Sequence, residues 1–333
     1  MRRVYEENGV QSRMKQDVMV SVIVPTYNHE RYIRQALDSI FLQEIPWNIE
    51  VLIGDDCSTD QTPEILKNYK KKYPDVIRLF LHEEHIGATK NAFELLTSSR
   101  GKYLATLEGD DYWCNKKKLL QQVEFLEKNP DFIGCTHHFL IVNEKNERQQ
   151  KKLSWINPKS EFTLADYDGI SLPGQPSTFV RRNIFLQPKH DYSICYKAHD
   201  LIADRILMLI FLCQGKFYCF QEIWSAYRIN NNKNGQNATT QVYRKRRSHV
   251  KDDFYLLSAM EEYAQKEFGI SVRFAKKKQA LFLDMLILTM LKPSQDNRAQ
   301  LGEIYANMPD HWKLWVLIPW LTIKKIIYYL KYH

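Results

Sequence analysis

The sequence LEGDDYW at residues 107–113 places three acids, Glu108, Asp110 and Asp111, within four positions. The residues before it, KYLATL at 102–107, are typical of a strand that runs into the protein interior. Like charges repel one another, and a carboxylate in a cleft loses hydration unless a cation compensates for it. The segment is therefore either a solvated turn or a place where a cation binds.

The residue types indicate which cation would bind. Asp110 and Asp111 offer hard oxygen ligands, which suit Mg²⁺ or Mn²⁺, whereas zinc would require His or Cys side chains that do not accompany them. A divalent cation at this place could neutralise a diphosphate, and Glu108 could accept hydrogen bonds from a ribose. We therefore expect a metal site at Asp110 and Asp111, with Glu108 beside a nucleotide.

A second acidic stretch, DDCSTD at residues 55–60, follows another apolar run. Asp55 or Asp56 could accept a hydrogen bond from the imino group of a nucleobase. Asp, Ser and Thr are also good helix caps, so a turn that caps the next helix explains the same residues. On this motif alone the capping turn is favoured.

Both acidic stretches follow predicted strands, which near-continuous apolar runs place at residues 19–25, 49–55, 76–81 and 102–107. Helical apolar spacing separates these runs, and one helix is expected to have Thr62 as its N-cap and Pro63 as its first residue. Alternating strands and helices are typical of a doubly wound parallel sheet, in which ligands bind beyond the carboxyl ends of the strands. We expect these ends, with PTYN, DDCSTD, HEEHIGATKN and EGDDYW, to meet at one rim.

Composition and missing motifs exclude several classes of protein. The net charge of +8 would suit nucleic acid, an anionic membrane surface or phosphorylated substrates. No zinc-finger spacing or RNA-binding signature occurs, so no nucleic-acid partner is expected. Neither GxGxxG nor GxxxxGKS/T follows the first strand, so the sheet is not expected to bind phosphates through a Gly-rich loop.

The six cysteines form no CxxC pair and lie among apolar residues, which favours reduced thiols and a cytoplasmic location. Residues 1–17 lack the apolar core of a secretory signal, and no run of about 18 apolar residues predicts a membrane-spanning helix. The segment HWKLWVLIPWLTIKKIIYYLKYH at 311–333 combines three tryptophans and four lysines with no acid. It is expected either to make a peripheral contact with the inner face of the cell membrane or to dock on the protein as a helix.

Four motifs in register carry a family resemblance: VSVIVPTYNHERYIRQALDSI, IEVLIGDDCSTDQT, HIGATKNAF and GKYLATLEGDDYW. In order and spacing they resemble the N-terminal halves of the inverting glycosyltransferases of family 2. The match is close over residues 19–135 and weaker to about residue 230, through GQPSTFVRR, ADRILMLIFLCQGKFYCF and SAYRINNN. The resemblance implies the GT-A fold, an α/β architecture in which helices flank a Rossmann-like, mostly parallel central sheet.

The resemblance also implies how the chain is divided. An N-terminal extension (1–18) would precede a GT-A catalytic domain (19–235), with a nucleotide-sugar half (19–135) and an acceptor half (136–235). A helical C-terminal region (236–333) would follow. Within the acceptor half, FIGCTHHFLIVNE is expected to be a strand and HDLIADRILMLIFLCQGK one long apolar helix that ends at Gly215.

Nucleotide and metal contacts follow position by position from the resemblance. The turn after the first strand would lie beside uracil and ribose, one of the two acids after the second strand would pair with uracil, and a lysine after the third would lie near the nucleotide. The implied nucleotide contacts are Pro25, Thr26, Tyr27, Asp55, Asp56, Lys90, Glu108 and Asp110, and the implied metal ligands are Asp110 and Asp111. Glu108 stands where Asp is common in the family.

The family's catalytic base is an acid at the start of a helix, about eleven residues before Gly-Lys and followed later by Tyr-Arg. Asp204 meets this spacing, and Asp200, one turn earlier, is the alternative. An acid at a helix N-terminus also stabilises the helix dipole, which would explain either residue without catalysis. Trp113, His199 and Arg228 are further candidates for contacts with the diphosphate or the acceptor.

The leading hypothesis is a metal-dependent inverting glycosyltransferase of cell-surface polysaccharide synthesis. It would move a sugar from a nucleotide-sugar, expected to be UDP-linked, to a hydroxyl of a saccharide or lipid-linked saccharide. A sugar nucleotidyltransferase would need a Gly/Arg/Lys-rich loop where PTYNHE stands. A non-catalytic nucleotide-sugar-binding protein would not need the acids at 110, 111 and 204. A homo-oligomer is left open.

Overall fold

The computed structural model of the chain describes residues 17–151, 153, 155–156, 159–199, 202–229 and 249–308. The chain divides into two compact units, residues 1–238 and 239–333, and each is described by itself below.

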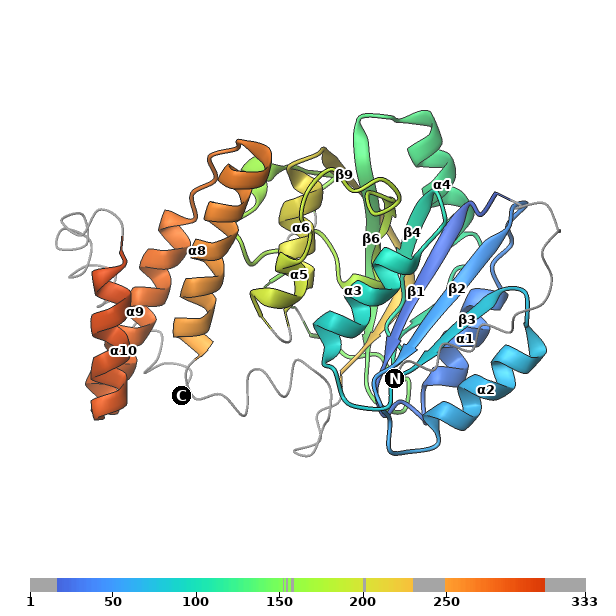
Figure 1. Ribbon diagram of the computed structural model, residues 1–333, viewed down its shortest axis with the longest axis horizontal. Coiled ribbons are helices and arrows are strands. Elements are labelled where there is room, and N and C mark those ends of the chain that lie inside the picture. Colours follow the sequence, from blue (N-terminus) through green and yellow to red (C-terminus); the bar gives the residue numbers. More distant parts are fainter. Residues whose placement is uncertain are drawn as a thin grey trace. The chain divides into compact units, whose positions relative to one another are not determined.

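A sheet of nine strands, counted over the described residues, forms the centre of the first unit (Figure 1). Its order is β3-β2-β1-β4-β8-β6-β9-β5, with β7 paired to β9. The strands are β1 (Val20–Thr26), β2 (Ile49–Asp55), β3 (Ile77–Leu81), β4 (Tyr103–Thr106), β5 (Tyr112–Trp113), β6 (Phe132–Val142), β7 (Glu161–Phe162), β8 (Val180–Arg182) and β9 (Lys216–Arg228).

Helices cover both faces of this sheet, because the side chains of its central strands are apolar on both sides. Alternate valines of β1 pack in one apolar cluster with three helices, α1 (Ile33–Phe41), α2 (Thr62–Lys72) and α4 (Lys118–Lys128). On the opposite face lies α3 (Ala88–Ser98) (Figure 1). A Cβ added at Gly54 would lie 2.1 Å from Oδ1 of Asn91 in α3, so only glycine fits at this position of β2.

The central sheet is mixed, with parallel and antiparallel strand pairs. The strands β3, β2, β1 and β4 are parallel, as expected, but β8 runs antiparallel to both of its neighbours, β4 and β6. The single-turn helix before β8, η2 (Pro176–Thr178), therefore lies near the carboxyl end of β4. This reversal brings residues of the second half of the unit to the rim.

Two predicted helical features differ in the structure. The apolar stretch 199–216 is not one helix: α5 (Ile194–Lys197) ends before it, and α6 begins at Asp204 and ends at Leu212. The N-cap of α2 is Gln61 instead of Thr62. The Thr62 hydroxyl accepts the backbone N–H of His29 at 2.9 Å, so this threonine connects α2 to the residues after β1.

The second unit contains three described helices, α8 (His249–Phe268), α9 (Ala275–Leu291) and α10 (Gln295–Ala306). Lys278 of α9 donates a hydrogen bond to Glu261 of α8, whose other carboxylate oxygen accepts the backbone N–H of Phe274. None of the helices among the described residues is both long enough and apolar enough to cross a membrane. The predicted membrane contact, 311–333, lies outside the described residues.

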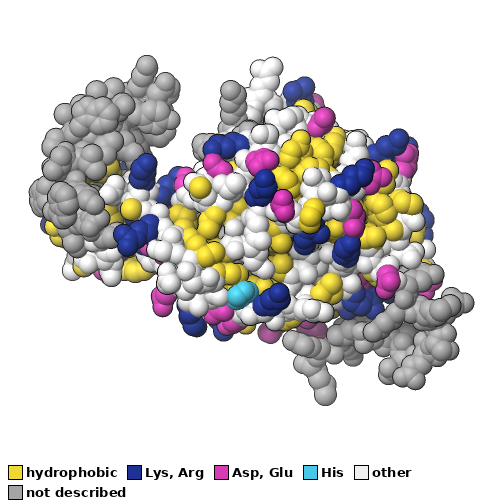
Figure 2. All heavy atoms as spheres, turned by 90° about the horizontal axis from the view of Figure 1, so that it is seen from above, with side chains coloured by type: hydrophobic (Ala, Val, Ile, Leu, Met, Phe, Trp, Pro, Cys, Tyr) yellow, Lys and Arg dark blue, Asp and Glu magenta, His cyan; other side chains and the backbone are white. Residues whose placement is uncertain are grey.

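Figure 2 shows one face of the molecule, on which the basic and acidic side chains of the described residues are interspersed.

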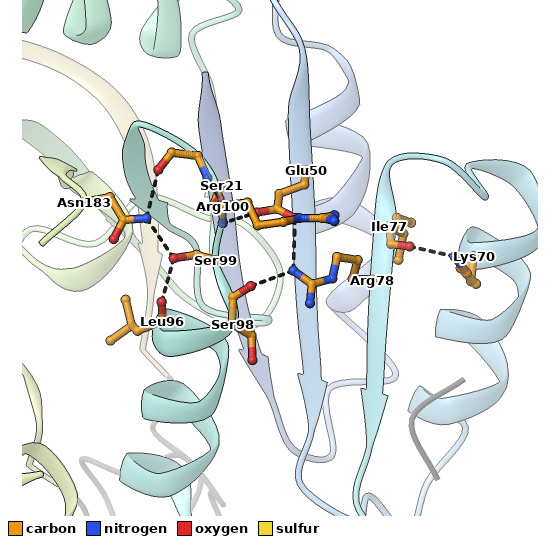
Figure 3. A network of polar contacts seen from close by, with 11 residues as sticks. Ser21, Glu50, Lys70, Ile77, Arg78, Leu96, Ser98, Ser99, Arg100 and Asn183 are labelled. Carbon is orange, nitrogen blue, oxygen red and sulfur yellow. Dashed lines mark hydrogen bonds and ion pairs between the residues drawn. The ribbon is translucent and has the colours of Figure 1, made fainter. Parts of the chain in front are cut away.

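A buried carboxylate holds the amino ends of the central strands together (Figure 3). Glu50 of β2 is 3% exposed and accepts from the Ser21 hydroxyl at 2.6 Å and the Arg100 backbone N–H at 2.6 Å. Its second oxygen accepts from the guanidinium groups of Arg78 and Arg100, at 3.2 and 3.1 Å. Burial alone would raise the pKa of Glu50, but these hydrogen bonds and positive charges outweigh it and lower the pKa below its ordinary value.

We expect Glu50→Gln to lower the free energy of unfolding at pH 7 by about 1–3 kcal/mol, because it removes charge-assisted hydrogen bonds. The folded-state pKa of Glu50 is lowered, so its stabilisation is present above the ordinary carboxyl pKa and is lost as the pH falls through the folded-state value. Urea unfolding of both proteins at pH 7 and at about pH 3 measures this change. Glu44→Gln, at an exposed position, is the control, and a difference that does not shrink in acid would contradict the prediction.

Candidate active site

The predicted rim exists, and the carboxyl ends of β1, β2 and β4 form it. Strand register places Thr26 beside Asp55, and the backbone N–H of Asp56 donates to the Thr26 carbonyl at 3.0 Å. The backbone N–H of Gly109 donates to the Pro25 carbonyl at 3.3 Å. The residues after three separate strands are thus joined by main-chain hydrogen bonds.

Residues 108–111, the acid segment, form a turn at this rim. The backbone N–H of Asp111 donates to the Glu108 carbonyl at 3.0 Å. A Cβ at Gly109 would lie 2.7 Å from both Thr26 Oγ1 and His29 Nδ1, so the turn approaches the end of β1 more closely than any other residue type would allow.

The two aspartates of the acid segment differ in exposure. Asp111 is 1% exposed, and its oxygens accept from the Ser177 hydroxyl at 2.7 Å and the Arg228 backbone N–H at 2.9 Å. The Asp110 side chain is 18% exposed, with one oxygen 4.0 Å from Nε2 of His29. Of the two, Asp110 is therefore the carboxylate that solvent reaches.

Asp204, at the start of α6, is one of the acids that affect the pKa of Glu108 in the acid segment. Burial raises the pKa of Glu108 well above its ordinary value, and the negative charges of Asp111, Asp110 and Asp204 raise it further. Burial and Asp110 likewise raise the pKa of Asp111. Asp204 is half-buried, and its Oδ1 accepts the backbone N–H of Arg205 at 2.8 Å. Asp200, the alternative base, lies outside the described residues.

Both acids of the second strand end already accept hydrogen bonds. Asp55 is buried, which raises its pKa, and it accepts from the hydroxyl and backbone N–H of Ser58 at 2.6 and 3.0 Å. Asp56 accepts the backbone N–H groups of Ile86 at 2.8 Å and Gly87 at 3.1 Å. Each acid therefore shapes a loop of the rim, and their contact with a nucleobase remains a prediction.

Tyr27 and His85 lie together beside these loops, with ring centroids 4.7 Å apart and Nδ1 of His85 3.1 Å from Asp56 Oδ2. The His85 side chain is 57% exposed, so this pair presents aromatic surface at the rim. Lys90 is exposed in the first turn of α3.

Arg228 is buried and its guanidinium is hydrogen-bonded within the protein, and its contact with a diphosphate or an acceptor stays a prediction. It donates to the Asp110 carbonyl at 2.8 Å and the Asn143 carbonyl at 3.0 Å. It also donates to side-chain oxygens of Gln35 at 3.0 Å and Asn146 at 2.8 Å. The guanidinium carbon lies 4.3 Å from the ring centre of Tyr32.

Trp113, another predicted contact, is 4% exposed and lies behind the acid segment, where its indole N–H donates to the Ser177 carbonyl at 2.8 Å. His199 is half-buried, a few residues before α6.

Lys118, the first residue of α4, is 0% exposed and lies with Nζ 4.1 Å from the Trp113 ring centre. Burial lowers the pKa of Lys118 to about 7, and Nζ has no hydrogen-bond partner among the described residues.

Sequence reasoning missed three residues of the site: His29, Ser58 and Ser177. His29 lies in the PTYNHE loop after the first predicted strand, and an imidazole at this position could have indicated a residue of the site. Ser58 lies in DDCSTD, where a serine is already explained by a turn that caps a helix. Ser177 contacts Asp111 across 66 positions of sequence, and no spacing rule could have indicated it.

A divalent cation fits the chemistry of the rim, though not as a complete protein cage. No three His, Cys, Asp or Glu side chains within the described ranges are grouped closely enough to hold a metal by themselves. Magnesium commonly binds through one or two carboxylates together with substrate phosphates and water, a pattern to which the partly exposed Asp110 can contribute. Burial and the neighbouring acids raise the pKa of Glu108, and a bound positive charge would oppose both effects.

A mixed sheet flanked by helices, with acids collected beyond the carboxyl ends of its first strands, puts the candidate site where ligands bind in open α/β sheets. The chain matches the Glycosyl transferase family 2 domain over residues 21–186. An uncharacterised glycosyltransferase of Mycoplasma pneumoniae is 36% identical over 223 residues, which cover 64% of this chain and 69% of that protein. The chain belongs to glycosyl transferase family 2.

Two further proteins are similar to the chain. An uncharacterised protein of Mycobacterium tuberculosis is 39% identical over 211 residues, which cover 63% of this chain but only 58% of that protein. TarS of Staphylococcus aureus, solved as residues 1–349 with UDP-GlcNAc, has a TM-score of 0.62 at 20% identity and covers 88% of this chain and 82% of that one. At this identity the likeness shows the fold, which is GT-A as the sequence predicts.

We expect Arg228→Lys to lower the free energy of unfolding by about 1–3 kcal/mol, because hydrogen bonds of a buried charged group would be left unmade. A lysine ammonium cannot reproduce the planar set of donors that bonds to Asp110, Asn143, Gln35 and Asn146. Urea unfolding measures the loss. Arg148→Lys, at an exposed position nearby, should change stability by less than about 0.5 kcal/mol, and equal effects of both variants would contradict the role given to Arg228.

We expect Lys118→Met to be more stable than the wild type near pH 7, with an advantage that shrinks as the pH rises toward 10. The folded protein releases the Lys118 proton at a pKa of about 7, whereas the unfolded chain keeps it up to the ordinary lysine value. Wild-type stability therefore rises with pH across this interval, by up to about 1.4 kcal/mol per pH unit from this group. Unfolding at several pH values, with Lys117→Met as the exposed control, measures the slope; a constant difference would contradict the prediction.

Proposed function

We propose that the protein is a metal-dependent inverting glycosyltransferase that uses a UDP-sugar and a saccharide or lipid-linked saccharide acceptor. One observation carries this proposal: α6 begins at Asp204, so an acid stands at the start of a helix as the family spacing implies, in the same unit as the partly exposed Asp110. In this proposal Asp204 acts as the base, and the acid segment binds the cation and the nucleotide.

The acid segment would bind the leaving group. Asp110, whose carboxylate is partly exposed, is the proposed metal ligand of the protein, with Glu108 on the ribose side. Asp111, the second predicted ligand, is better suited to hold the segment in place, because both of its oxygens accept hydrogen bonds within the protein. A bound Mg²⁺ or Mn²⁺ would supply positive charge to stabilise the departing diphosphate.

Asp204 would take the proton of the acceptor hydroxyl as its oxygen attacks the anomeric carbon. A single displacement inverts that carbon, so the base and the diphosphate must lie on opposite sides of the sugar. General-base assistance of this kind contributes on the order of 10²–10⁴ in rate. Half-burial leaves the Asp204 carboxylate accessible to a substrate.

The donor and acceptor classes draw support from a relative. TarS of S. aureus bears the name poly(ribitol-phosphate) beta-N-acetylglucosaminyltransferase and has been solved with UDP and UDP-GlcNAc. We propose a UDP-sugar donor, bound by the loops that contain Pro25–Tyr27, Asp55 and Asp56, and a cell-surface polymer or its lipid-linked precursor as acceptor. A peripheral contact of residues 311–333 with the inner face of the membrane would suit a lipid-linked acceptor.

Assays of the purified full chain test the proposal. UDP-, GDP- and dTDP-sugars are screened with Mn²⁺ or Mg²⁺ for thermal stabilisation and for release of free nucleotide, since a ligand of the native state raises its stability. We expect UDP-sugars to stabilise the protein in a metal-dependent way. Asp110→Ala should abolish both effects, whereas Asp204→Asn should keep donor binding and lose about 10²–10⁴ in transfer rate. Asp75→Asn, at an exposed position, is the control.

Each alternative predicts a different result. A sugar nucleotidyltransferase would release pyrophosphate from a nucleoside triphosphate and a sugar phosphate. A binding protein would be stabilised by the donor but would not turn it over with any acceptor. Undiminished transfer by Asp204→Asn would rule out this residue as the base.

A further inference from the structure

One hydroxyl contacts both ends of the acid segment. Oγ of Ser177 accepts the backbone N–H of Glu108 at 3.0 Å and donates to Oδ2 of Asp111 at 2.7 Å. The hydrogen bond from Asp111 N–H to the Glu108 carbonyl closes the turn between these ends. Gly109 and Asp110 are the central residues of the turn, so its shape decides where the Asp110 carboxylate points.

Ser177 is itself fixed from several directions. It is 0% exposed, its N–H donates to Oε1 of Gln175 at 2.7 Å, and its carbonyl accepts the indole N–H of Trp113 at 2.8 Å. Every polar group of this serine is therefore hydrogen-bonded. Its neighbour Thr178 is also tied down, because its carbonyl accepts from the side chain of Gln122 in α4 at 3.0 Å.

The arrangement separates the roles of two adjacent aspartates. Asp111, with oxygens taken by Ser177 and by the Arg228 N–H, faces inward at 1% exposure, while Asp110 keeps 18% of its side chain exposed. Without the Ser177 hydroxyl, one oxygen of Asp111 would lose its donor in a buried place where that loss is costly. The least costly response is for the turn to shift so that Asp111 reaches water.

We propose that Ser177 is a positioning residue: its hydroxyl holds the acid segment in the conformation that turns Asp110 toward the cation and the diphosphate. The inference rests on the proposed function, in which Asp110 is the metal ligand. Groups that orient metal ligands without touching the metal typically change affinity by about 10–100-fold when they are removed.

Ser21 provides a matched control. Its hydroxyl also donates to a buried carboxylate, Glu50, at 2.6 Å and accepts a backbone N–H, that of Gly101, at 2.7 Å. It is likewise 0% exposed, but it lies at the amino ends of the strands, away from the rim (Figure 3). Ser21→Ala therefore removes the same kinds of contact without touching the acid segment.

The test compares the full-length wild type with Ser177→Ala and Ser21→Ala, after circular dichroism has shown that each variant is folded. Hydrogen exchange of residues 108–113 is measured without ligand, because exchange reports local opening of the backbone. Mn²⁺ binding is then measured by titration in the presence of UDP. We expect Ser177→Ala to exchange at least about tenfold faster over 108–113 and to bind Mn²⁺ about 10–100-fold more weakly, with Ser21→Ala like the wild type in both.

The two readouts separate this inference from the proposed function. Unchanged exchange over 108–113 in Ser177→Ala would overturn the positioning role, whatever the metal does. Faster exchange with unchanged Mn²⁺ affinity would also overturn it, because the held conformation would then be unnecessary for binding. If Ser177→Ala exchanges faster while even the wild type binds no Mn²⁺ with UDP, Ser177 holds the segment but the proposed function is wrong.

Discussion

The buried guanidinium of Arg228, at the end of β9, connects the segments that form the candidate site. Arg228 donates to main-chain and side-chain oxygens from α1, from the acid segment and from the loop after β6, and its own N–H donates to Asp111. Burying a cation costs several kcal/mol unless its hydrogen bonds are satisfied. The segments must therefore keep the positions in which they accept the hydrogen bonds of the guanidinium. The position of the acids at the rim depends on this constraint more than on any contact among the acids themselves.

The two ends of the sheet use carboxylates in opposite ways. At the amino ends, Glu50 is surrounded by donors and positive charge, which lower its pKa and make it a source of stability. At the carboxyl ends, burial raises the pKa of Glu108, and its acidic neighbours raise it further. A fold can tolerate such a repulsive cluster where a cationic ligand binds. The hydrogen bonds of Glu50 at the other end of the sheet provide stability that the site does not.

The sequence predicted the parts of this architecture that depend on local patterns. The four parallel strands, the rim beyond their carboxyl ends and the GT-A fold all follow from apolar runs and from motifs in register. The inward position of Asp111 could not be predicted, because it depends on Ser177 and Arg228, which are 66 and 117 positions away in the chain. For the same reason the burial of Arg228 and Trp113, both candidates for contacts with the diphosphate or the acceptor, could not be predicted. Spacing reports what is near along the chain, whereas burial is decided by elements that meet only in the folded protein.

The way Asp56 is satisfied affects how this rim can change in evolution. Its carboxylate holds the loop before α3 through the main-chain N–H groups of Ile86 and Gly87, which every residue except proline possesses. Gly87 itself has a φ of 94°, so it is constrained, but the side chains at 85 and 86 are not needed for these two hydrogen bonds. Replacing His85 would remove the contact of its Nδ1 with Asp56 Oδ2 at 3.1 Å but would leave both main-chain hydrogen bonds in place. The residue types at 85 and 86 can therefore change while these two hydrogen bonds still hold the loop.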